Sequence, residues 1–350
     1  MPTLRLHPFT PQVRTVCFGL LILAASSLQA ASGTQGAAFL EIPVGARPAA
    51  LGSAYSALAT DAYAPVWNAA GLGFLQSPQL TGQHLSYLES INYEHVGFVA
   101  PLGTRAGQPP AFGALGVSAQ YLGSGDITGR DPSGQLTGDF SNHFAAYALA
   151  YGHAIGDQLS LGITGKWINA KLADYSANAY AVDLGSLYRY RENLSFAFTA
   201  TNIGSRLNFI SDSDPLPTAL HTAVAYRPWT PWLVTAEGVF ETAGAANGHF
   251  GVEWEPLKAV SLRTGYRTDP LQELSALAGF STGIGLSFWG QEFSYAWVPY
   301  GDLGDTQYFS LLIKFGADEE RKNLKTTRAT SSLSEPDYEQ LLQLGAPQSL

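Results

Sequence analysis

The sequence predicts an all-β fold, a transmembrane antiparallel β-barrel of about 14 strands with a short N-terminal helical hatch in its lumen. The chain has few charged residues (13%) and many hydrophobic (46%) and aromatic (12%) ones. Even so, no stretch after residue 30 is apolar enough to span a bilayer as a helix, which takes about 20 residues. Apolar and polar residues instead alternate from about residue 79 to residue 315, and short and long connections follow each other in turn.

Residues 1–30 are typical of a secretory signal peptide. Arg5 and Arg14 make the start positive, residues 16–23 form an apolar core, and small residues lead to an expected cleavage site after Ala30. An uncleaved anchor helix is the alternative, although its apolar core is short for spanning a bilayer. Cleavage removes Cys17, the only cysteine of the chain, so the mature protein is expected to have no disulfide and no thiol chemistry.

The charge balance argues against nucleic acid as a partner. The formal net charge is −9, and loss of Arg5 and Arg14 with the signal peptide makes it more negative. Nucleic-acid binding depends on basic residues that neutralise phosphates, and the chain has no run of Lys or Arg.

Residues 31–78 differ from the alternating region and are expected to form the hatch. Pro48 is well placed to open a helix, which helical spacing of apolar residues continues to Leu58. Asp61 and Pro65 break this pattern, and a Gly-rich turn follows at 67–73. One short helix and a turn cannot bury a core of their own, so the barrel lumen is their expected host.

Residues 79–316 are expected to form the barrel, because alternation gives each strand one apolar face and one wet face. In the last strand Phe309, Leu311, Ile313 and Phe315 share one face, and Tyr308, Ser310 and Lys314 share the other. The same pattern recurs at 178–190, 220–227, 248–255, 259–267 and 293–299.

The connections distinguish a membrane barrel from a soluble all-β protein, which gives the same local alternation. Short connections are expected near 155–157, 191–193, 228–231, 255–256 and 290–291, and long ones at 123–141, 203–218 and 267–275. Outer-membrane barrels have an even number of strands, short periplasmic turns and long outer loops. We therefore expect a bacterial outer-membrane location with both termini in the periplasm. Aromatic girdles are expected from Tyr188, Tyr190, Trp254, Trp297 and Tyr300.

Residues 317–350 continue past the last predicted strand as a periplasmic tail. Their first part is charged and polar and is expected to be a linker, and most of the tail is expected to be disordered. A short helix at 336–344 is the structured alternative, and such a segment is able to dock onto a secretion-system or periplasmic protein partner.

Several motifs, in order along residues 36–316, resemble the PorV/PorQ family of the wider FadL-like group of barrels. The N-terminal run is Gly45-Ala46-Arg47-Pro48-Ala49-Ala50-Leu51-Gly52-Ser53-Ala54-Tyr55, followed by Asp61-Ala62 and Trp67-Asn68-Ala69-Ala70-Gly71-Leu72. Later matches are Ile91-Asn92-Tyr93-Glu94, 125–131, Asp183-Leu184-Gly185, Asn202-Ile203-Gly204, Leu216-Pro217, 263–267 and 299–306.

The resemblance implies a 14-stranded outer-membrane barrel whose N-terminal segment is a hatch in the lumen. In the family, Pro usually follows the Trp-Asn pair, and Ala69 stands there in this chain. We expect the hatch to be organised around Trp67, Asn68 and Gly71. Among the charges expected to face the lumen, those in family-like stretches are the expected hatch contacts, namely Asp183, Arg263 and Arg267.

The remaining lumen charges have two interpretations. Mixed charges in a narrow wet lumen usually pair or are solvated, and the alternative is a polar gate around the hatch. The set is Lys166, Asp183, Arg189, Arg227, Glu237, Glu253, Arg263 and Arg267.

No motif predicts an enzyme, a metal site or a cofactor. The histidines are scattered one per strand without ligand spacing, and no strand offers a paired catalytic constellation. The sequences 123–125 and 283–285 are not phosphate loops, because no helix follows them; they are interpreted as a loop tip and as small residues that make room for the hatch. Three aspartates in 123–141 leave cation binding as an alternative to a solvated loop.

Two functions follow from the resemblance. The first is protein secretion or surface presentation, as a type IX-like shuttle or attachment component. The alternative is FadL-like passive uptake of a hydrophobic small molecule, gated by the hatch. An apolar path through the lumen favours uptake, whereas a plugged lumen with large outer loops favours a protein partner.

Overall fold

The computed structural model describes residues 35–87, 91–103, 108–209, 212–242, 246–268, 277–301 and 304–316. The predicted signal peptide and the predicted tail helix at 336–344 lie outside these residues and stay predictions. Within the described ranges, no helix is long and apolar enough to cross a membrane.

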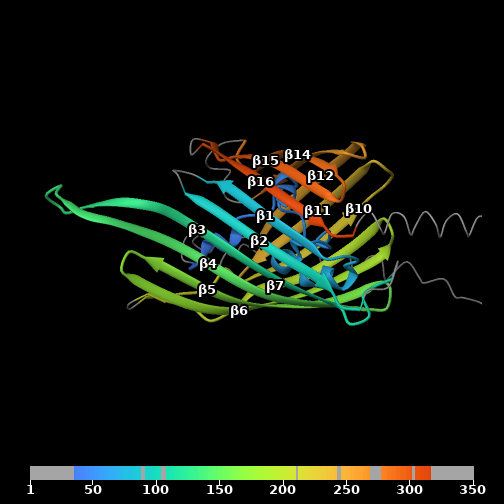
Figure 1. The fold of residues 1–350 in the computed structure, drawn as a ribbon, viewed down its shortest axis with the longest axis horizontal. Coiled ribbons are helices and arrows are strands. Elements are labelled where there is room, and N and C mark those ends of the chain that lie inside the picture. The colour runs from blue at the N-terminus through green and yellow to red at the C-terminus, as the bar shows by residue number, and fades with distance from the viewer. Residues whose placement is uncertain are drawn as a thin grey trace, which may run out of the picture.

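Fourteen strands close into an antiparallel barrel, which confirms the predicted fold class and strand number (Figure 1). Each strand pairs with its neighbour in sequence, except that β7 pairs with β10, and β16 closes the barrel on β1. The barrel strands are β1 Gln79–Ser86, β2 Asn92–Pro101, β3 Ala114–Arg130, β4 Leu136–Ile155, β5 Leu159–Leu172, β6 Tyr175–Arg191, β7 Leu194–Gly204, β10 Ala219–Tyr226, β11 Trp232–Glu241, β12 Ala246–Leu257, β13 Val260–Arg267, β14 Phe280–Phe288, β15 Gln291–Pro299 and β16 Asp305–Lys314.

The two faces of the wall match the alternation in the sequence. On β16, Phe309 and Leu311 are 38% and 40% exposed on the outer face, whereas Tyr308 and Ser310 are buried in the lumen. Large apolar side chains are likewise exposed on all the remaining barrel strands except β1. A closed wall satisfies its own backbone hydrogen bonds, so an apolar outer face of this kind suits lipid.

The connections define two ends of the barrel. At the short-turn end, tight turns join β4 to β5, β6 to β7, β12 to β13 and β14 to β15. The β2–β3 connection at this end is longer, over 102–113. At the long-loop end lie the predicted long connection at 203–218 and the protruding β3–β4 hairpin (Figure 1). The predicted long connection at 267–275 lies mostly outside the described residues.

The predicted 123–141 loop is wrong, because β3 and β4 continue pairing to Arg130 and Leu136. The Gly123-Ser124-Gly125 sequence is a β-bulge within β3, where the register shifts and Gly125 has φ +65°, rather than a loop tip. The short turn beyond is stabilised by the Asp131 carboxylate, which accepts backbone N–H bonds from Ser133 and Gln135 at 2.8 and 2.9 Å. Most residues of this outer hairpin are polar or Gly, with Ile127, Leu136 and Phe140 as its exposed apolar side chains.

Aromatic side chains gather near both edges of the apolar outer face. Trp232 and Trp254 stack at 5.7 Å near the short-turn end, and Tyr147 stacks on Trp167 at 5.3 Å nearer the long-loop end. Tyr300 was wrongly predicted for a girdle, since it is 6% exposed and its ring packs against Tyr87.

The N-terminal segment runs through the lumen as short helical turns. These are η1 Ala38–Glu41, α2 Ala46–Ala50, α3 Ala64–Trp67 and η2 Ala69–Phe74. The predicted helix from Pro48 to Leu58 is shorter than expected, because Gly52 and Ser53 adopt left-handed φ values of 61° and 64° after α2. Pro65, predicted only as a breaker, opens the second helix α3.

The β7–β10 connection folds toward the start of the hatch. It carries the small hairpin of β8 Leu207–Phe209 and β9 Asp212–Asp214. Leu207 is fully buried in the same cluster as Phe39, and the Gly36 N–H donates to Pro215 O at 2.9 Å. The hatch therefore runs from this long connection to Pro78 at the short-turn end, where Phe315 N–H donates to Pro78 O. The periplasmic location of both termini stays a prediction.

Candidate functional site

The hatch rests on two rows of small residues in the wall. The first row, the β4–β6 seat, consists of Gly152, Gly162 and Gly185, which are register partners on β4, β5 and β6. Any side chain there would collide with the hatch. An added Cβ would lie 2.2 Å from Ala69 O at Gly152, 2.1 Å from Ala70 N at Gly162, and 2.2 Å from Asn68 Oδ1 at Gly185.

The second row, the β12–β14 seat, consists of Gly251, Gly265 and Ser281, again register partners on adjacent strands. A Cβ at Gly265 would lie 2.0 Å from Gly52 N, and one at Gly251 would lie 2.6 Å from Leu51 O. The Ser281 hydroxyl accepts from Gly52 N at 3.2 Å and donates to Ala50 O at 3.1 Å. Gly283, predicted to make room for the hatch, lies beside Ala50.

Wall hydroxyls also bond the hatch backbone directly. Ser160 Oγ donates to Ala70 O at 2.6 Å and Thr164 Oγ1 donates to Pro65 O at 3.2 Å. On the other side Thr235 Oγ1 donates to Ala54 O at 3.0 Å. These bonds satisfy hatch carbonyls that would otherwise be buried without partners.

A buried charge network, here called the latch, joins α2 to the wall. Arg47 donates two bonds to the Glu253 carboxylate on β12, each of 2.8 Å. The same carboxylate accepts from Arg263 Nε at 2.7 Å, and Arg263 also pairs with Glu292 at 2.7 Å. The Glu253 side chain has no exposed area and Arg263 is 2% exposed. The predicted contact residue Arg263 thus reaches the hatch through Glu253.

The latch was missed in the sequence, although one clue was present. Arg47 is the only Lys or Arg between Arg14 and Arg105. A lone cation in a segment expected to be buried in a lumen requires a carboxylate partner. Choosing Glu253 among the lumen acids required the fold, because the two residues are 206 positions apart.

A second polar contact lies nearer the long-loop end. The Glu237 carboxylate on β11 accepts from Ser56 Oγ at 2.6 Å and from Ser56 N at 3.0 Å. His221 Nδ1 lies 2.9 Å from the same carboxylate. Here the carboxylate lies between serine and histidine, so this group is not a serine–histidine nucleophile pair.

Asp183 lies in a wall cluster rather than against the hatch. Lys166 Nζ is 2.6 Å from its carboxylate and 2.8 Å from Asn202 Oδ1. Asp183 also accepts from Asn202 N at 2.7 Å, where β7 bulges and Asn202 has φ 57°. Its observed partners therefore stabilise the bulge. Arg267, also predicted, is buried in the lumen near the long-loop end of β13.

The three predicted hatch residues have separate places. Asn68 caps η2 by accepting from Ala70 N at 3.1 Å, and its amide donates to Ser56 O and to Ser186 O on β6. Trp67 donates to Val44 O at 2.9 Å, within the hatch. Gly71 packs so closely on the hatch backbone that a Cβ would be 1.6 Å from Ala59 O.

Asp61 is a fully buried acid inside the hatch. Its carboxylate accepts from Tyr55 OH at 2.5 Å and from Tyr63 N at 3.0 Å. Burial raises the pKa of Asp61 above its ordinary value, and the hydrogen bond from Tyr55 and the charge of Arg47 offset part of that rise. A cavity of about 10 Å³ adjoins Asp61 and Arg47.

An apolar cluster fills part of the lumen toward the long-loop end. Phe39 packs on Phe144 of β4 at 5.6 Å, and Leu207 and Leu216 from the β7–β10 connection join the same buried cluster. Buried charged residues such as Glu237 and Arg267 also lie in this half of the lumen.

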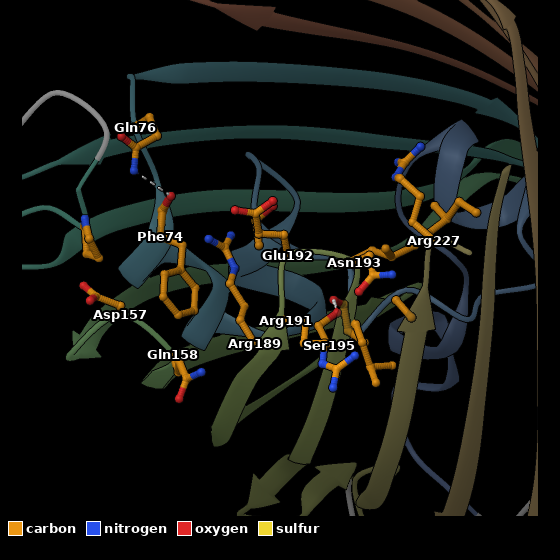
Figure 2. A pocket seen from close by; sticks show the side chains of 17 residues that line it. Phe74, Gln76, Asp157, Gln158, Arg189, Arg191, Glu192, Asn193, Ser195 and Arg227 are labelled. Carbon is orange, nitrogen blue, oxygen red and sulfur yellow. Dashed lines mark hydrogen bonds between the residues drawn. The ribbon is translucent and has the colours of Figure 1, made fainter. Parts of the chain in front are cut away.

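An open pocket of about 770 Å³, here called the vestibule, lies at the short-turn end (Figure 2). The turns β4–β5, β6–β7 and β10–β11 form its rim, and the end of the hatch forms one side. Arg189 lies 3.8 Å from the centre of the Phe74 ring, a cation–π contact. Neither the vestibule nor the rest of the described chain holds a group of three or more His, Cys, Asp or Glu suited to a metal ion.

No family model matches the sequence, and no curated protein matches it. Solved structures do. The toluene transporter TodX of Pseudomonas putida has a TM-score of 0.51 and 13% identity over 77% of this chain and 96% of its own. The CymD monoaromatic hydrocarbon channel has a TM-score of 0.52 and 11% identity, over 78% of this chain and 98% of its own. A Pseudomonas aeruginosa FadL homologue has a TM-score of 0.51 and 10% identity, over 77% of this chain and 98% of its own.

These structural neighbours are FadL-type outer-membrane barrels, and TodX and CymD are a transporter and a channel rather than enzymes. At such low identity the similarity establishes the fold of the chain. It gives no support to the PorV/PorQ family within that fold, so that resemblance stays a prediction.

Proposed function

We propose that this chain is a bacterial outer-membrane channel for hydrophobic small molecules, closed at rest by its N-terminal hatch. The observation that carries the proposal is a closed barrel whose lumen holds the hatch under a buried latch of Arg47 and Glu253. The shared fold of a toluene transporter and a monoaromatic hydrocarbon channel supports it.

The apolar cluster around the start of the hatch suggests a path for the solute. A hydrophobic solute binds in the long-loop half when the hatch start, including Phe39, withdraws from it. It then passes the latch and leaves through the vestibule. Short turns face the periplasm in outer-membrane barrels, so the vestibule is the periplasmic exit.

Uptake by whole bacterial cells tests this function. Cells whose outer membrane excludes a labelled monoaromatic hydrocarbon should take it up faster when they make this protein. Arg47→Gln weakens the latch and should raise the rate further, whereas Arg206→Gln, which changes an arginine exposed on the β7–β10 connection, should leave it unchanged. Equal uptake by cells with and without the protein would refute the proposal. So would equal uptake by cells that make the intact protein and cells that make a variant lacking residues 36–74.

A second candidate is contact with a protein partner in secretion or surface presentation. The protruding β3–β4 hairpin favours it, because it extends the wall beyond the other connections (Figure 1). Pull-down with intact protein and with chains lacking residues 124–141 or 317–350 tests it. Failure to recover any protein with the intact chain would exclude this candidate.

A further inference from the structure

The vestibule combines an apolar floor with a rim of guanidinium groups. Figure 2 shows Arg189 directed toward Phe74, with Arg191 and Arg227 along the rim. The floor is formed by side chains of the hatch and of strands β10 and β11. These are Ala57, Leu58, Phe74, Ala225 and Leu233.

The rim arginines have little carboxylate compensation. Arg189 contacts Phe74 and makes no ion pair with any residue in the described ranges, and Arg191 lies over the Tyr190 ring at 5.3 Å. Arg227 pairs with Glu255 only at 3.7 Å. Asp157 and Glu192 also line the pocket, so the three arginines exceed the two acids. A ligand with both carboxylates and apolar groups suits this combination.

The described chain ends beside this pocket. Phe315 N–H donates to Pro78 O at 3.0 Å, and Gln76, two residues earlier, lines the vestibule. Eighteen residues, 317–334, then precede an acidic and apolar sequence, Glu335-Pro336-Asp337-Tyr338-Glu339-Gln340-Leu341-Leu342-Gln343-Leu344. A flexible linker of that length has a reach of about 20–25 Å, on the scale of a barrel mouth.

We propose that residues 335–344 of this chain dock in the vestibule. Glu335, Asp337 and Glu339 pair with the rim arginines, and Leu341, Leu342 and Leu344 pack on the apolar floor. Tethering raises the effective concentration of the segment at its site, so each contact needs to be only modest. This docking does not depend on the proposed function.

Disulfide cross-linking in the full-length chain tests the docking. Cys17 is the only cysteine of the chain and lies in the predicted signal peptide, so any disulfide in the mature protein comes from the introduced cysteines. Leu233→Cys with Leu342→Cys should cross-link at least tenfold faster than Trp232→Cys with Leu342→Cys. Leu233 faces the vestibule floor, whereas its neighbour Trp232 is 36% exposed on the outer face.

Three further measurements separate docking from chance collision. Excess synthetic peptide of residues 334–346 should slow the Leu233 cross-link severalfold, and a scrambled peptide should not. Glu335→Gln, Asp337→Asn and Glu339→Gln together should slow it likewise, as should 0.5 M salt, which screens exposed charges.

Equal cross-linking at positions 232 and 233, or equal effects of the two peptides, would overturn the proposal. A third result would also overturn it: the peptide slows cross-linking of neither cysteine pair, whereas lauric acid protects the cysteine of Leu233→Cys. That result would assign the vestibule to small amphiphiles. None of these readouts requires transport, so failure here is distinct from failure of the proposed function.

Discussion

The hatch meets the barrel wall on two sides that differ in how they hold it. At the β4–β6 seat, residues 68–73 touch a row of three glycines, and their hydrogen bonds to the wall come from the neutral groups of Asn68 and Ser160. At the β12–β14 seat, residues 50–52 touch a similar row, and the latch of Arg47, Glu253 and Arg263 lies beside it. Shape holds the first side, and shape and charge together hold the second, so the charged side is the one a solute or a change in protonation can release.

The largest effect is expected where shape alone holds the hatch. Gly162→Leu places a branched side chain where even a Cβ is 2.1 Å from Ala70 N, so residues 68–73 must leave the wall. Amide hydrogen exchange of 68–74 should rise by several orders of magnitude. Gly165→Leu on the same strand is the control, since nothing lies within 4 Å of its Cβ. Equal protection in both variants would contradict the role of the seat.

Removal of the central carboxylate of the latch should have the next largest effect. Glu253→Gln leaves Arg47 and Arg263 buried near each other without their shared anion. Loss of one partner of a buried ion pair typically costs about 3–5 kcal/mol. Urea unfolding in detergent micelles should show a loss of that order, with increased exchange at residues 46–53. An unchanged midpoint would mean that the charges do not hold the second side.

Protonation of Asp61 should make hatch docking depend on pH. Because burial raises the pKa of Asp61, the docked hatch binds the proton more tightly than the released hatch. The resulting stabilisation is complete below the ordinary carboxyl pKa and is lost as pH rises through the raised value. The protection of the amides of residues 55–63, after correction for the intrinsic pH dependence of exchange, should therefore fall as pH rises through that window. Asp61→Asn should flatten the profile, and an unchanged profile in that variant would assign the dependence to another group.

The smallest loss of stability is expected for the Arg227–Glu255 pair at the short-turn end. Glu255 lies two residues beyond Glu253 on β12, and its pair with Arg227 spans 3.7 Å between side chains about one-third exposed. Solvent-exposed pairs contribute about 0–1 kcal/mol. Glu255→Gln should thus change the urea midpoint little and should leave hatch exchange unaltered. A loss as large as that of Glu253→Gln would erase the distinction between the latch and the surface.

Strand number and the direction of the side chains were predictable because both follow from local period-2 alternation. The extent of the β3–β4 hairpin was not, since most of its residues are polar or Gly and the alternation disappears although pairing continues to Arg130. The motif predicted Asn68 as a central residue of the hatch but not its bond to Ser186 O in the wall, and Asp183, predicted as a hatch contact, bonds Asn202 at a bulge. The latch and the glycine rows depend on which strands become neighbours of the hatch, and that information is nonlocal.

The most direct test of hatch gating is a reversible covalent lock. Cβ atoms at positions 50 and 283 would lie 2.7 Å apart, and the one at 283 would also lie 2.5 Å from Tyr295 O. Ala50→Cys with Gly283→Cys therefore forms a disulfide once the hatch and the wall at β14 each shift, the two Cβ atoms separating by about 1 Å. Uptake of a monoaromatic hydrocarbon by cells carrying this variant should stop after oxidation and return to the rate of the reduced protein after addition of a reductant. Equal uptake in the oxidised and reduced forms would show that solutes do not need the hatch to move, and would contradict the account.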